Sequence, residues 1–279
     1  MLSVVILTCN SRKHIATCLD AVLVQSAPDS EVIVVDNGST DGTKELVRDR
    51  GARVRLIENP VNRGASGARN QGIENSSGEW VLTLDCDVVL GEGFLERFRE
   101  ASESLSVDTG MVQPCVLDWD GRTVYSQGIY LSRLRRFFDL NRGKHTCVSP
   151  DAGRKIIGPC SAAAFYRRSM LEALKERTGY FDERFFFLVE DADLAWRAKR
   201  AGWKVAYFAA CVCFHAGNSS STDPKLRQYL SWRNRRWMVA KNEGFWGKWA
   251  LVVIAFPYEL TRMLWMTITN PCFRAGSRK

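Results

Sequence analysis

The sequence predicts an α/β fold built on a mostly parallel sheet with helices on both faces. Short apolar runs rich in β-branched residues have the composition of buried strands, and they lie at residues 2–8, 31–36, 54–58 and 80–84. Helical stretches separate these runs, at residues 13–25, at about 40–50 and from residue 62 onward. Strand and helix therefore alternate as they do in right-handed βαβ units. Polar residues follow the strands at their carboxyl ends, where open α/β sheets bind ligands.

The composition is that of an ordinary soluble globular protein. Of 279 residues, 46% are hydrophobic and 25% are charged. The net charge of +8 predicts attraction to anions such as phosphorylated metabolites, acidic lipid head groups or nucleic acid. The nine cysteines are scattered and include no Cys-x-x-Cys pair, which favours reduced thiols in a cytoplasmic protein over zinc or redox centres. The first residues lack a basic region and a cleavage site, so we expect no signal peptide.

An acidic pair follows the fourth predicted strand. The run Trp80–Leu84 ends in Asp85-Cys86-Asp87, and in an extended strand two carboxylates at this spacing point to the same face. Oxygen ligands suit Mg²⁺ or Mn²⁺, which takes further ligands from water and substrate phosphates. The sequence therefore predicts a shared divalent ion, with an Asp-rich turn as the alternative interpretation.

Two further polar residues lie near strand ends or a helix start. Asp36 ends an apolar strand, so its carboxylate is a good acceptor for ribose hydroxyls or for the imide N–H of a pyrimidine. Arg69 lies in the first turns of a glycine-containing helix, where a cation and backbone N–H groups suit a diphosphate. An exposed helix arginine is the alternative interpretation for Arg69.

The second half of the chain contains another acidic cluster. Residues Glu190-Asp191-Ala192-Asp193 begin a predicted helix, where the helix dipole favours anions, and simple helix-terminal charges are the alternative interpretation. His215 follows a predicted strand at 205–214 and on its own is typical of a structural residue. The basic and aromatic run 229–237 lacks an RNP-like motif or a repeat, which argues against nucleic-acid binding.

Several motifs in one order resemble a known family. They are Val4–Asn10, Val34–Gly42, Asn62–Gly64, Ala68–Gly72, Leu84–Asp87, Phe181–Phe186, Glu190–Arg197, Gly202-Trp203 and Val212–His215. Together they resemble family 2 glycosyltransferases with the GT-A fold, which are inverting enzymes that use nucleotide-diphospho sugars. The resemblance covers about residues 2–242. Phe181-Asp182-Glu183 followed by the Glu190 motif is most similar to the rhamnosyltransferase and galactofuranosyltransferase branch of cell-surface polysaccharide assembly.

The resemblance implies roles for individual residues. Asp191 is implied as the general base and Glu190 as its catalytic neighbour at the acceptor. The residues implied in binding the UDP- or dTDP-sugar are Thr8, Asn10, Asp36, Asn37, Arg69, Asp85 and Cys86. The implied ligands of Mn²⁺ or Mg²⁺ are Asp85, Asp87 and His215, and the imidazole favours Mn²⁺. The residues implied near a glycan or lipid-linked glycan acceptor are Asp193, Trp232 and Arg233.

Residues 156–168 are predicted to form the buried strand that precedes the catalytic helix. The family commonly has Gly-Ala-Ala in this strand, whereas this chain has Ser161-Ala162-Ala163. A side chain therefore stands where the backbone is expected to approach the donor sugar closely.

The chain is predicted to have three parts. They are a nucleotide-sugar-binding half at 1–110, an acceptor-binding and catalytic half of the same GT-A domain at 111–242, and a C-terminal helical tail at 243–279.

The tail carries an uncharged, largely apolar run from Trp249 to Tyr258 that Pro257 interrupts. It is too short and too broken to span a bilayer. Its tryptophans and basic flanks favour an interfacial helix on the inner face of an anionic cell membrane. Docking on the domain or on a second subunit, as in a homodimer, is the alternative.

Two other functions are weighed against glycosyl transfer. A sugar nucleotidyltransferase needs a glycine-rich, lysine-bearing phosphate loop after the first strand, and Thr8-Cys9-Asn10-Ser11-Arg12 is not one. A non-catalytic, membrane-associated module that only binds nucleotide sugars would be indicated by loss of Asp191 or of Asp85 or Asp87, and all three are present.

Overall fold

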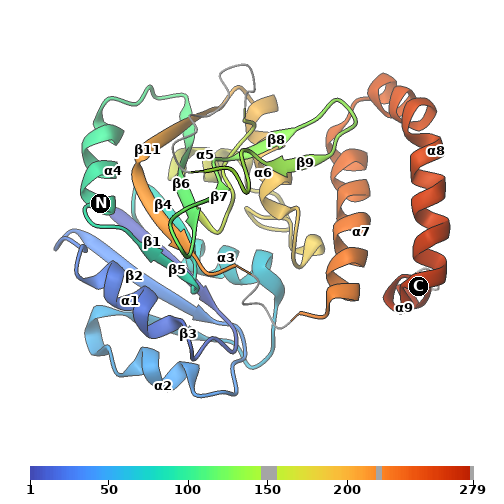
Figure 1. The fold of residues 1–279 in the computed structure, drawn as a ribbon. Coiled ribbons are helices and arrows are strands. Elements are labelled where there is room, and N and C mark those ends of the chain that lie inside the picture. The colour runs from blue at the N-terminus through green and yellow to red at the C-terminus, as the bar shows by residue number, and fades with distance from the viewer. Residues whose placement is uncertain (146–155, 218–221, 277–279) are drawn as a thin grey trace.

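The computed structural model describes residues 1–145, 156–217 and 222–276, and nine of the strands in these ranges form one sheet (Figure 1). Eight of them follow the order β3 (Arg55–Glu58), β2 (Ser30–Asp36), β1 (Leu2–Thr8), β4 (Trp80–Asp85), β10 (Ala163–Arg167), β6 (Thr109–Asp118), β11 (Lys204–His215) and β5 (Val88–Leu90). The ninth, β7 (Val124–Ser126), pairs with β6. Strands β3, β2, β1 and β4 are parallel, β6 and β11 are parallel, and β10 runs antiparallel to β4 and β6.

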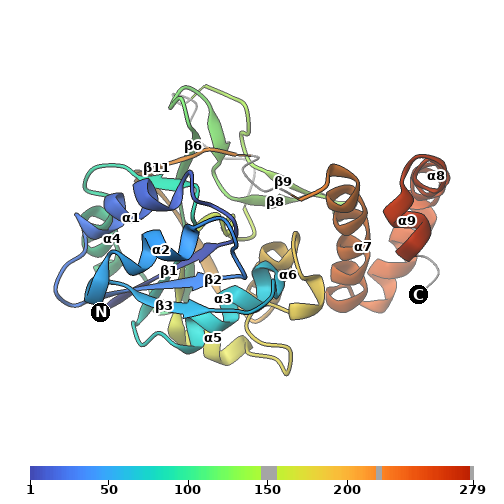
Figure 2. The same cartoon turned by 90° about the horizontal axis from the view of Figure 1, so that it is seen from below.

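Helices cover both faces of this sheet (Figure 2), which confirms the predicted fold class. One face carries α1 (Ile15–Leu23), α2 (Thr43–Arg48) and α4 (Phe94–Glu103), and the other carries α3 (Gly64–Glu74), α5 (Arg168–Leu174) and α6 (Glu190–Arg200). The strand side chains alternate between the two layers. Val4 and Ile6 pack with the first layer, and Val5 and Leu7 pack with the second. Burial on both faces explains why apolar residues follow one another without alternation in Val4–Leu7 of β1 and Val32–Val35 of β2.

The sheet joins strands from both predicted halves of the domain. Strands β10, β6 and β11 of the second half lie between β4 and β5 of the first half. The short hairpin of β8 (Ile129–Leu131) and β9 (Phe137–Asp139) forms a separate two-stranded sheet. The 3-10 turns η1 (Gly51–Arg53) and η2 (Glu183–Phe185) lie before β3 and before α6.

Two predicted strands differ from the observed ones. The long strand predicted at 156–168 was wrong, because Ala163–Arg167 alone forms β10 and the residues before it make one isolated bridge, Gly158 to Ile129. Pro159, which has no N–H to donate to a ladder, accounts for the shorter strand. The extended geometry assumed for Asp85 to Asp87 was also wrong, since β4 ends at Asp85 and a turn leads into β5.

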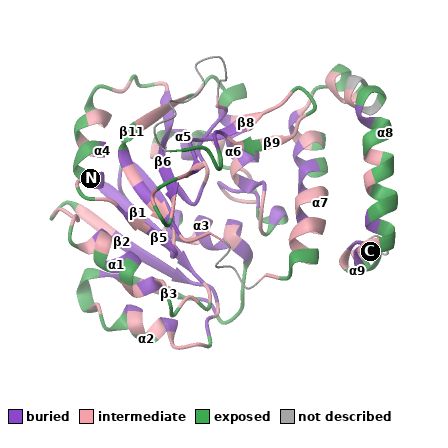
Figure 3. Ribbon diagram, viewed as in Figure 1, coloured by how far each residue is buried: buried purple, intermediate pink, exposed green. Residues whose placement is uncertain are grey.

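The C-terminal residues form three helices beside the second helical layer. Helix α7 (Pro224–Asn242) packs on α6, α8 (Phe245–Thr269) runs outside it, and α9 (Pro271–Gly276) folds back onto α7 (Figure 1). Helix α8 continues through Pro257, which corrects the interruption predicted there. In Figure 3 most of α8 is coloured as exposed, unlike the buried sheet. No helix in the described part of the chain has the length and apolarity to cross a membrane.

Candidate active site

Three side chains that meet at one edge of the sheet form a candidate metal group. Asp85 ends β4, Asp87 lies in the turn that follows, and His215 ends β11. The pairing of β11 with β5 sets His215 opposite Val88, so it lies next to Asp87. One potential ligand atom from each residue lies within 4.8 Å of the other two. Two carboxylates and one imidazole are a donor set that fits Mn²⁺ or Mg²⁺.

The electrostatics at Asp85 favour a nearby cation. Burial raises the pKa of its carboxyl group, and the charge of Asp87 raises it further, while Arg69 acts in the opposite direction. Asp87 itself is buried, with the imidazole Nε2 of His215 3.4 Å from its Oδ1. A divalent ion would relieve the repulsion between the two carboxylates, so the residues fit the metal that the sequence predicts.

The imidazole of His215 is held in a definite orientation. Its Nδ1 accepts a hydrogen bond of 2.8 Å from the backbone N–H of Gly217, and its ring lies 4.1 Å from the ring of Tyr125. A neutral His215 in this geometry carries its proton on Nε2, facing Asp87. Metal coordination through Nε2 needs the other tautomer, and Gly217 N–H must then turn away from Nδ1. Asp85 and Asp87 therefore fit a metal as they stand, and His215 fits it after a local adjustment.

Arg69 links this group to the second acidic cluster. The guanidinium is 3% exposed, and it donates to Asp85 Oδ1 at 2.9 Å and to Glu190 Oε1 at 2.6 Å. Burial opposes its charge, but Asp85 and Glu190 outweigh that effect and raise the pKa of Arg69 above its ordinary value. The alternative of an exposed helix arginine is wrong. Contact between Arg69 and a donor diphosphate stays a prediction.

The two candidate catalytic carboxylates begin helix α6. Glu190 is buried, and burial raises the pKa of its carboxyl group to about 7 against the opposing effect of Arg69. Asp191 is half-buried, and its Oδ2 accepts hydrogen bonds from the backbone N–H of Ser161 at 3.2 Å and from the Ser161 hydroxyl at 3.3 Å. The backbone N–H of Ala192 donates to Asp191 Oδ1 at 2.8 Å. The carboxylate is thus oriented on one side and still reachable by solvent.

The chain enters α6 through a strained loop. Phe186, Leu188 and Val189 have φ values of 64°, 70° and 77°, a left-handed region that is costly for residues other than glycine and most of all for a β-branched one. Gly64 packs against this loop, since a Cβ on Gly64 would clash with the carbonyl oxygen of Phe186. Strain of this kind persists only where surrounding contacts fix the backbone.

Those contacts come from Asn234 of α7, which sequence reasoning missed. The fully buried Asn234 amide lies 2.9, 2.8 and 2.8 Å from the carbonyl oxygens of Phe185, Phe187 and Leu188. Nothing in the local sequence marks this asparagine among the basic and aromatic residues 229–237. Its role depends on a loop more than forty positions earlier.

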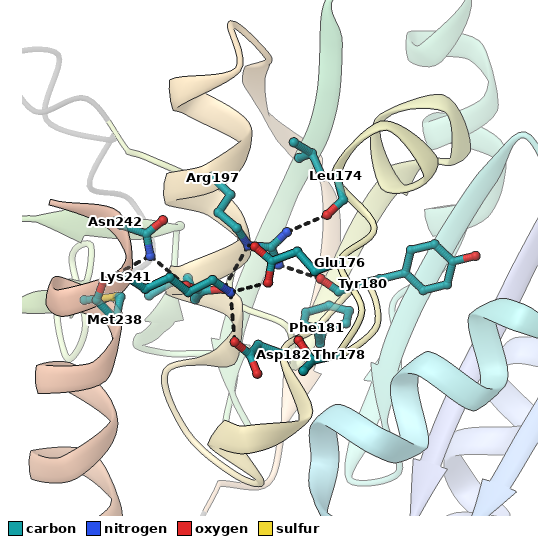
Figure 4. Close-up of polar contacts among 12 residues, drawn as sticks. Leu174, Glu176, Thr178, Tyr180, Phe181, Asp182, Arg197, Met238, Lys241 and Asn242 are labelled. Atoms are coloured by element: carbon teal, nitrogen blue, oxygen red, sulfur yellow. Dashed lines mark hydrogen bonds and ion pairs between the residues drawn. The ribbon is translucent and has the colours of Figure 1, made fainter. Parts of the chain in front are cut away.

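Asp193 joins α6 to α7 through a second set of polar contacts, whose other members Arg197, Lys241 and Asn242 are labelled in Figure 4. It is fully buried and accepts hydrogen bonds from Arg197 Nε at 2.9 Å, Lys241 Nζ at 3.0 Å and Asn242 Nδ2 at 2.6 Å. Lys241 also reaches Asp182 at 2.9 Å. Burial opposes the charge of Asp182, but Arg184 and Lys241 together hold its pKa well below the usual range. The contacts shown make Asp193 a structural residue, and an acceptor role for it stays a prediction.

The predicted nucleotide-binding residues surround the carboxyl ends of β1 and β2. Asp36 is buried, and its Oδ2 accepts from the N–H of Ser39 at 2.9 Å. Its Oδ1 has no hydrogen-bond partner among the described residues, and the buried hydroxyl of Thr8 has the Cys86 thiol as its neighbour. Buried polar atoms in this state suit contact with a ligand. Asp36 Oδ1 therefore has bonding capacity left for a nucleoside.

Three other predicted donor-site residues are used in holding loops together. Asn10 Oδ1 accepts from the N–H of Thr40 at 2.8 Å, and Asn37 Nδ2 donates to Asn62 Oδ1 at 2.9 Å. Cys86 is buried, and burial raises the pKa of its thiol to about 12. It therefore stays a neutral thiol, and its contact with a nucleotide sugar stays a prediction.

The two predicted acceptor residues of α7 contact α9, the turn before α6 and a neighbouring residue of α7. Trp232 packs edge-on against Phe273 of α9, with ring centroids 4.9 Å apart. Arg233 donates to the carbonyl oxygen of Phe185 at 3.3 Å and stacks over Trp237. Both side chains serve the packing of α7, and their contact with an acceptor stays a prediction.

Comparison with known proteins gives the class that this fold and site define. Residues 3–175 match the model of glycosyl transferase family 2. The chain belongs to that family, and it is a glycosyltransferase that transfers a sugar from a nucleotide sugar. The chain is 29% identical over 254 residues to N-acetylglucosaminyl-diphospho-decaprenol L-rhamnosyltransferase of Mycobacterium tuberculosis, covering 80% of this chain and 79% of that protein. It is 40% identical over 111 residues to glycosyltransferase AglE of Haloferax volcanii, covering 38% of this chain and 36% of that protein.

Solved structures confirm the GT-A fold. The mannosyltransferase PcManGT from Pyrobaculum calidifontis, in complex with GDP-Man and Mn²⁺, matches with a TM-score of 0.61 and 19% identity over 96% of this chain and 75% of that one. GalNAc-T7 with UDP, GalNAc and Mn²⁺ matches with a TM-score of 0.64 and 14% identity over 86% of this chain and 47% of that one. The chain spans 66% of Staphylococcus aureus TarS 1–349, with 87% of its own length covered, a TM-score of 0.55 and 20% identity.

Proposed function

We propose that this glycosyltransferase moves a sugar, with inversion at the anomeric carbon, from a UDP- or dTDP-sugar to a hydroxyl group of a glycan or lipid-linked glycan in cell-surface polysaccharide synthesis. The observation that carries the proposal is that Arg69 hydrogen-bonds to Asp85 at 2.9 Å and to Glu190 at 2.6 Å. Inverting transfer needs one acidic site for the leaving group and a separate base for the acceptor. Arg69 keeps two such sites adjacent while neutralising part of their charge.

The donor side is proposed to bind the nucleotide through Asp36 and Thr8. Asp36 Oδ1 is an acceptor for the imide N–H of uracil or thymine, or for a ribose hydroxyl, because it has no partner among the described residues. Asp85, Asp87 and His215 would hold Mn²⁺ or Mg²⁺. When bound, such an ion neutralises the diphosphate leaving group. Related folds solved with GDP-Man and Mn²⁺ or with UDP-GlcNAc support this assignment.

The acceptor side is proposed to use Asp191 as the general base. As the acceptor oxygen bonds to the anomeric carbon, its proton passes to the Asp191 carboxylate. The bond between the anomeric carbon and the phosphate oxygen breaks, and the nucleoside diphosphate leaves with that electron pair. The two hydrogen bonds from Ser161 fix Asp191 Oδ2, and Glu190 lies beside it in contact with Arg69. The sugar transferred is proposed to be a hexosyl or rhamnosyl group, in line with the mycobacterial relative.

A lipid-linked acceptor is proposed because that relative is named for an acceptor on a decaprenol diphosphate. We place the enzyme in the cytoplasm, as a peripheral protein on the inner face of the cell membrane. The support is the set of exposed apolar residues along α8. A homodimer formed through α8 is the alternative use of those residues.

A panel of nucleotide sugars tests the proposal. Melting temperature is measured with UDP-, dTDP- and GDP-sugars, each with Mn²⁺ and with chelator, because a ligand that binds only the folded chain raises it. We expect a shift with a UDP- or dTDP-sugar in Mn²⁺, and loss of that shift with chelator. Release of the nucleoside diphosphate from the same sugar in the presence of an acceptor confirms transfer. A panel in which GDP-sugars alone stabilise the protein contradicts the donor assignment.

A further inference from the structure

The C-terminal helical unit, residues 224–276, differs from the rest of the chain in its charge. Residues 224–279 contain 11 of the 39 Lys and Arg residues and only 2 of the 31 Asp and Glu residues, so their balance is +9. Residues 1–223 contain 28 basic and 29 acidic residues and balance to −1. The whole excess of positive charge therefore lies in the last fifth of the chain. Helix α7 alone has six Lys and Arg residues and no acidic residue.

The same unit presents an uncharged apolar face. We call it the outer stripe, and its members are Trp246, Trp249, Val253, Phe256, Leu260, Leu264 and Ile268. They recur three or four positions apart, so they lie along one side of α8. All are exposed, with Trp246 at 81%, Val253 at 71% and Ile268 at 77%. An apolar stripe of this length on a stable helix indicates a contact with another apolar phase.

The opposite side of α8 is fixed to the protein. Ala255 and Met266 are buried, and Glu259 forms an ion pair with Arg235 of α7. Helix α9 then returns to α7, where Phe273 packs on Trp232. The unit holds α8 in place on the outer side of α7, and most of α8 is exposed (Figures 1 and 3).

We propose that the outer stripe lies in the surface of an anionic phospholipid bilayer, with the positive charge of the unit attracting the lipid phosphates. A helix is about 10 Å across, so basic residues on its far side, such as Lys248 and Arg262, stay within about one Debye length of the lipid surface. Tryptophan is the residue type favoured at such an interface, and the stripe begins with two of them. A second copy fits less well, because joining two outer stripes would bring together two C-terminal segments, residues 224–279, that each carry a charge of +9.

The inference extends the proposed function by naming the surface and the lipid. Helix α7 belongs to the C-terminal helical unit and also carries Asn234. A bilayer bound to α8 would therefore have a fixed orientation relative to the loop that leads into Glu190. An acceptor anchored in that bilayer would thus reach the active site from one side. Binding of the outer stripe to a bilayer does not depend on the proposed nucleotide-sugar donor or on Asp191 as the base.

Vesicle flotation of the full chain tests the inference. Vesicles of phosphatidylcholine are compared with vesicles that also contain phosphatidylglycerol, at low and at high salt. We expect binding to the anionic vesicles, and loss of most of it at high salt because the Debye length falls from about 10 Å to about 3 Å. The variant Trp246→Ser, Trp249→Ser, Val253→Ser should bind anionic vesicles at least about tenfold more weakly.

Control variants separate loss of vesicle binding from loss of folding. All three substituted residues are exposed, so the variant should fold, and its melting temperature and its shift with nucleotide sugar should equal those of the parent. Trp119→Ser, at an exposed tryptophan outside the unit, should bind vesicles like the parent. Absence of binding to anionic vesicles, or equal binding by the stripe variant, overturns the inference. So does a dimer in lipid-free solution that the stripe variant converts to monomer, which would assign the stripe to a second copy. Each result leaves the nucleotide-sugar panel unaffected, so failure here is separate from failure of the proposed function.

Discussion

Asp85 stands at the end of a strand whose other residues are all buried in the sheet, whereas Glu190 and Asp191 follow a loop with three left-handed residues. The first position is set by backbone pairing of β4 with β1 and β10. The second is set by side chains of α7, chiefly Asn234 and Lys241, which hold the loop and the start of α6. The donor side thus depends on the sheet, and the acceptor side depends on contacts between distant segments. The two sides should respond differently to substitution.

The largest effect is expected for Asp191→Asn. The substitution preserves size and leaves an amide oxygen to accept the Ser161 hydrogen bonds, but it removes the proton acceptor and the bond from the Ala192 N–H. Turnover should therefore fall by about 10²–10⁴ while donor affinity stays nearly unchanged. Single-turnover transfer and calorimetry with the nucleotide measure the two quantities. Glu190→Gln is the control and should be milder. Turnover of Asp191→Asn within about tenfold of the parent would move the base to Glu190 or Asp193.

On the donor side, Asp87→Ala should weaken Mn²⁺-dependent binding of UDP or dTDP by about 100-fold, because one anionic ligand is lost. His215→Ala should cost less, since coordination by His215 requires a change of tautomer and loss of the Gly217 contact. Calorimetry with Mn²⁺ and with chelator measures both variants. Undiminished affinity of Asp87→Ala would remove the metal assignment.

The acceptor-side loop is tested by Asn234→Ala. Removing the amide leaves three carbonyl oxygens of a strained loop without it, so the free energy of unfolding should fall by about 1–3 kcal/mol and turnover should fall with it. Donor affinity should stay the same. The matched control is Asn270→Ala, which removes a buried amide that bonds to Lys225 and Gln228 away from α6. If both variants lose stability equally and both keep full turnover, Asn234 is a packing residue only.

Glu190 predicts a pH dependence of stability. Its folded pKa is raised from 4.5 to about 7 by burial, so its contribution to stability is fully present below pH 4.5 and is lost as pH rises through about 7. The loss should be about 3 kcal/mol. Chemical unfolding of the metal-free protein between these pH values measures it. In Glu190→Gln the free energy of unfolding should no longer fall with pH over this range. If it still falls in that variant, another group is responsible for the pH dependence.

The smallest effect is expected for Ser161→Ala. Loss of the hydroxyl removes one of the two Ser161 hydrogen bonds to Asp191 Oδ2 and leaves the backbone N–H in place. One hydrogen bond contributes about 0.5–1.5 kcal/mol, so turnover should fall by a factor of about 2–10 with donor affinity unchanged. A steady-state comparison of kcat and KM for the donor measures it. A change confined to KM would place Ser161 at the donor sugar instead.

The difference between the two sides also decides how much the sequence reveals. The strand ends at Thr8, Asp36 and Asp85 could be predicted because an apolar run and the polar residue after it are neighbours in the chain. The contact of Asp85 with Glu190 through Arg69 could not, since it joins residues far apart in sequence. The turn at Cys86 and Asp87 was considered only as the alternative to an extended strand, because spacing alone does not show where a strand ends. The sequence around Asn234 gives no signal of its role, because the carbonyl groups that its amide contacts belong to a loop far away in the sequence.

The close approach of Gly64 to Phe186 has a consequence for building chimaeric enzymes. Residue 64 belongs to the part of the chain that would be exchanged to alter donor choice, and Phe186 belongs to the part that would be retained. At φ +77° and with no room for a Cβ, position 64 accepts glycine alone without displacing that backbone. A donor half grafted from a relative will therefore be compatible with this acceptor half where it supplies glycine at the same place. Whether such a chimaera folds therefore depends on the contact of residue 64 with the Phe186 backbone, which is distant from any site where the two sequences would be joined.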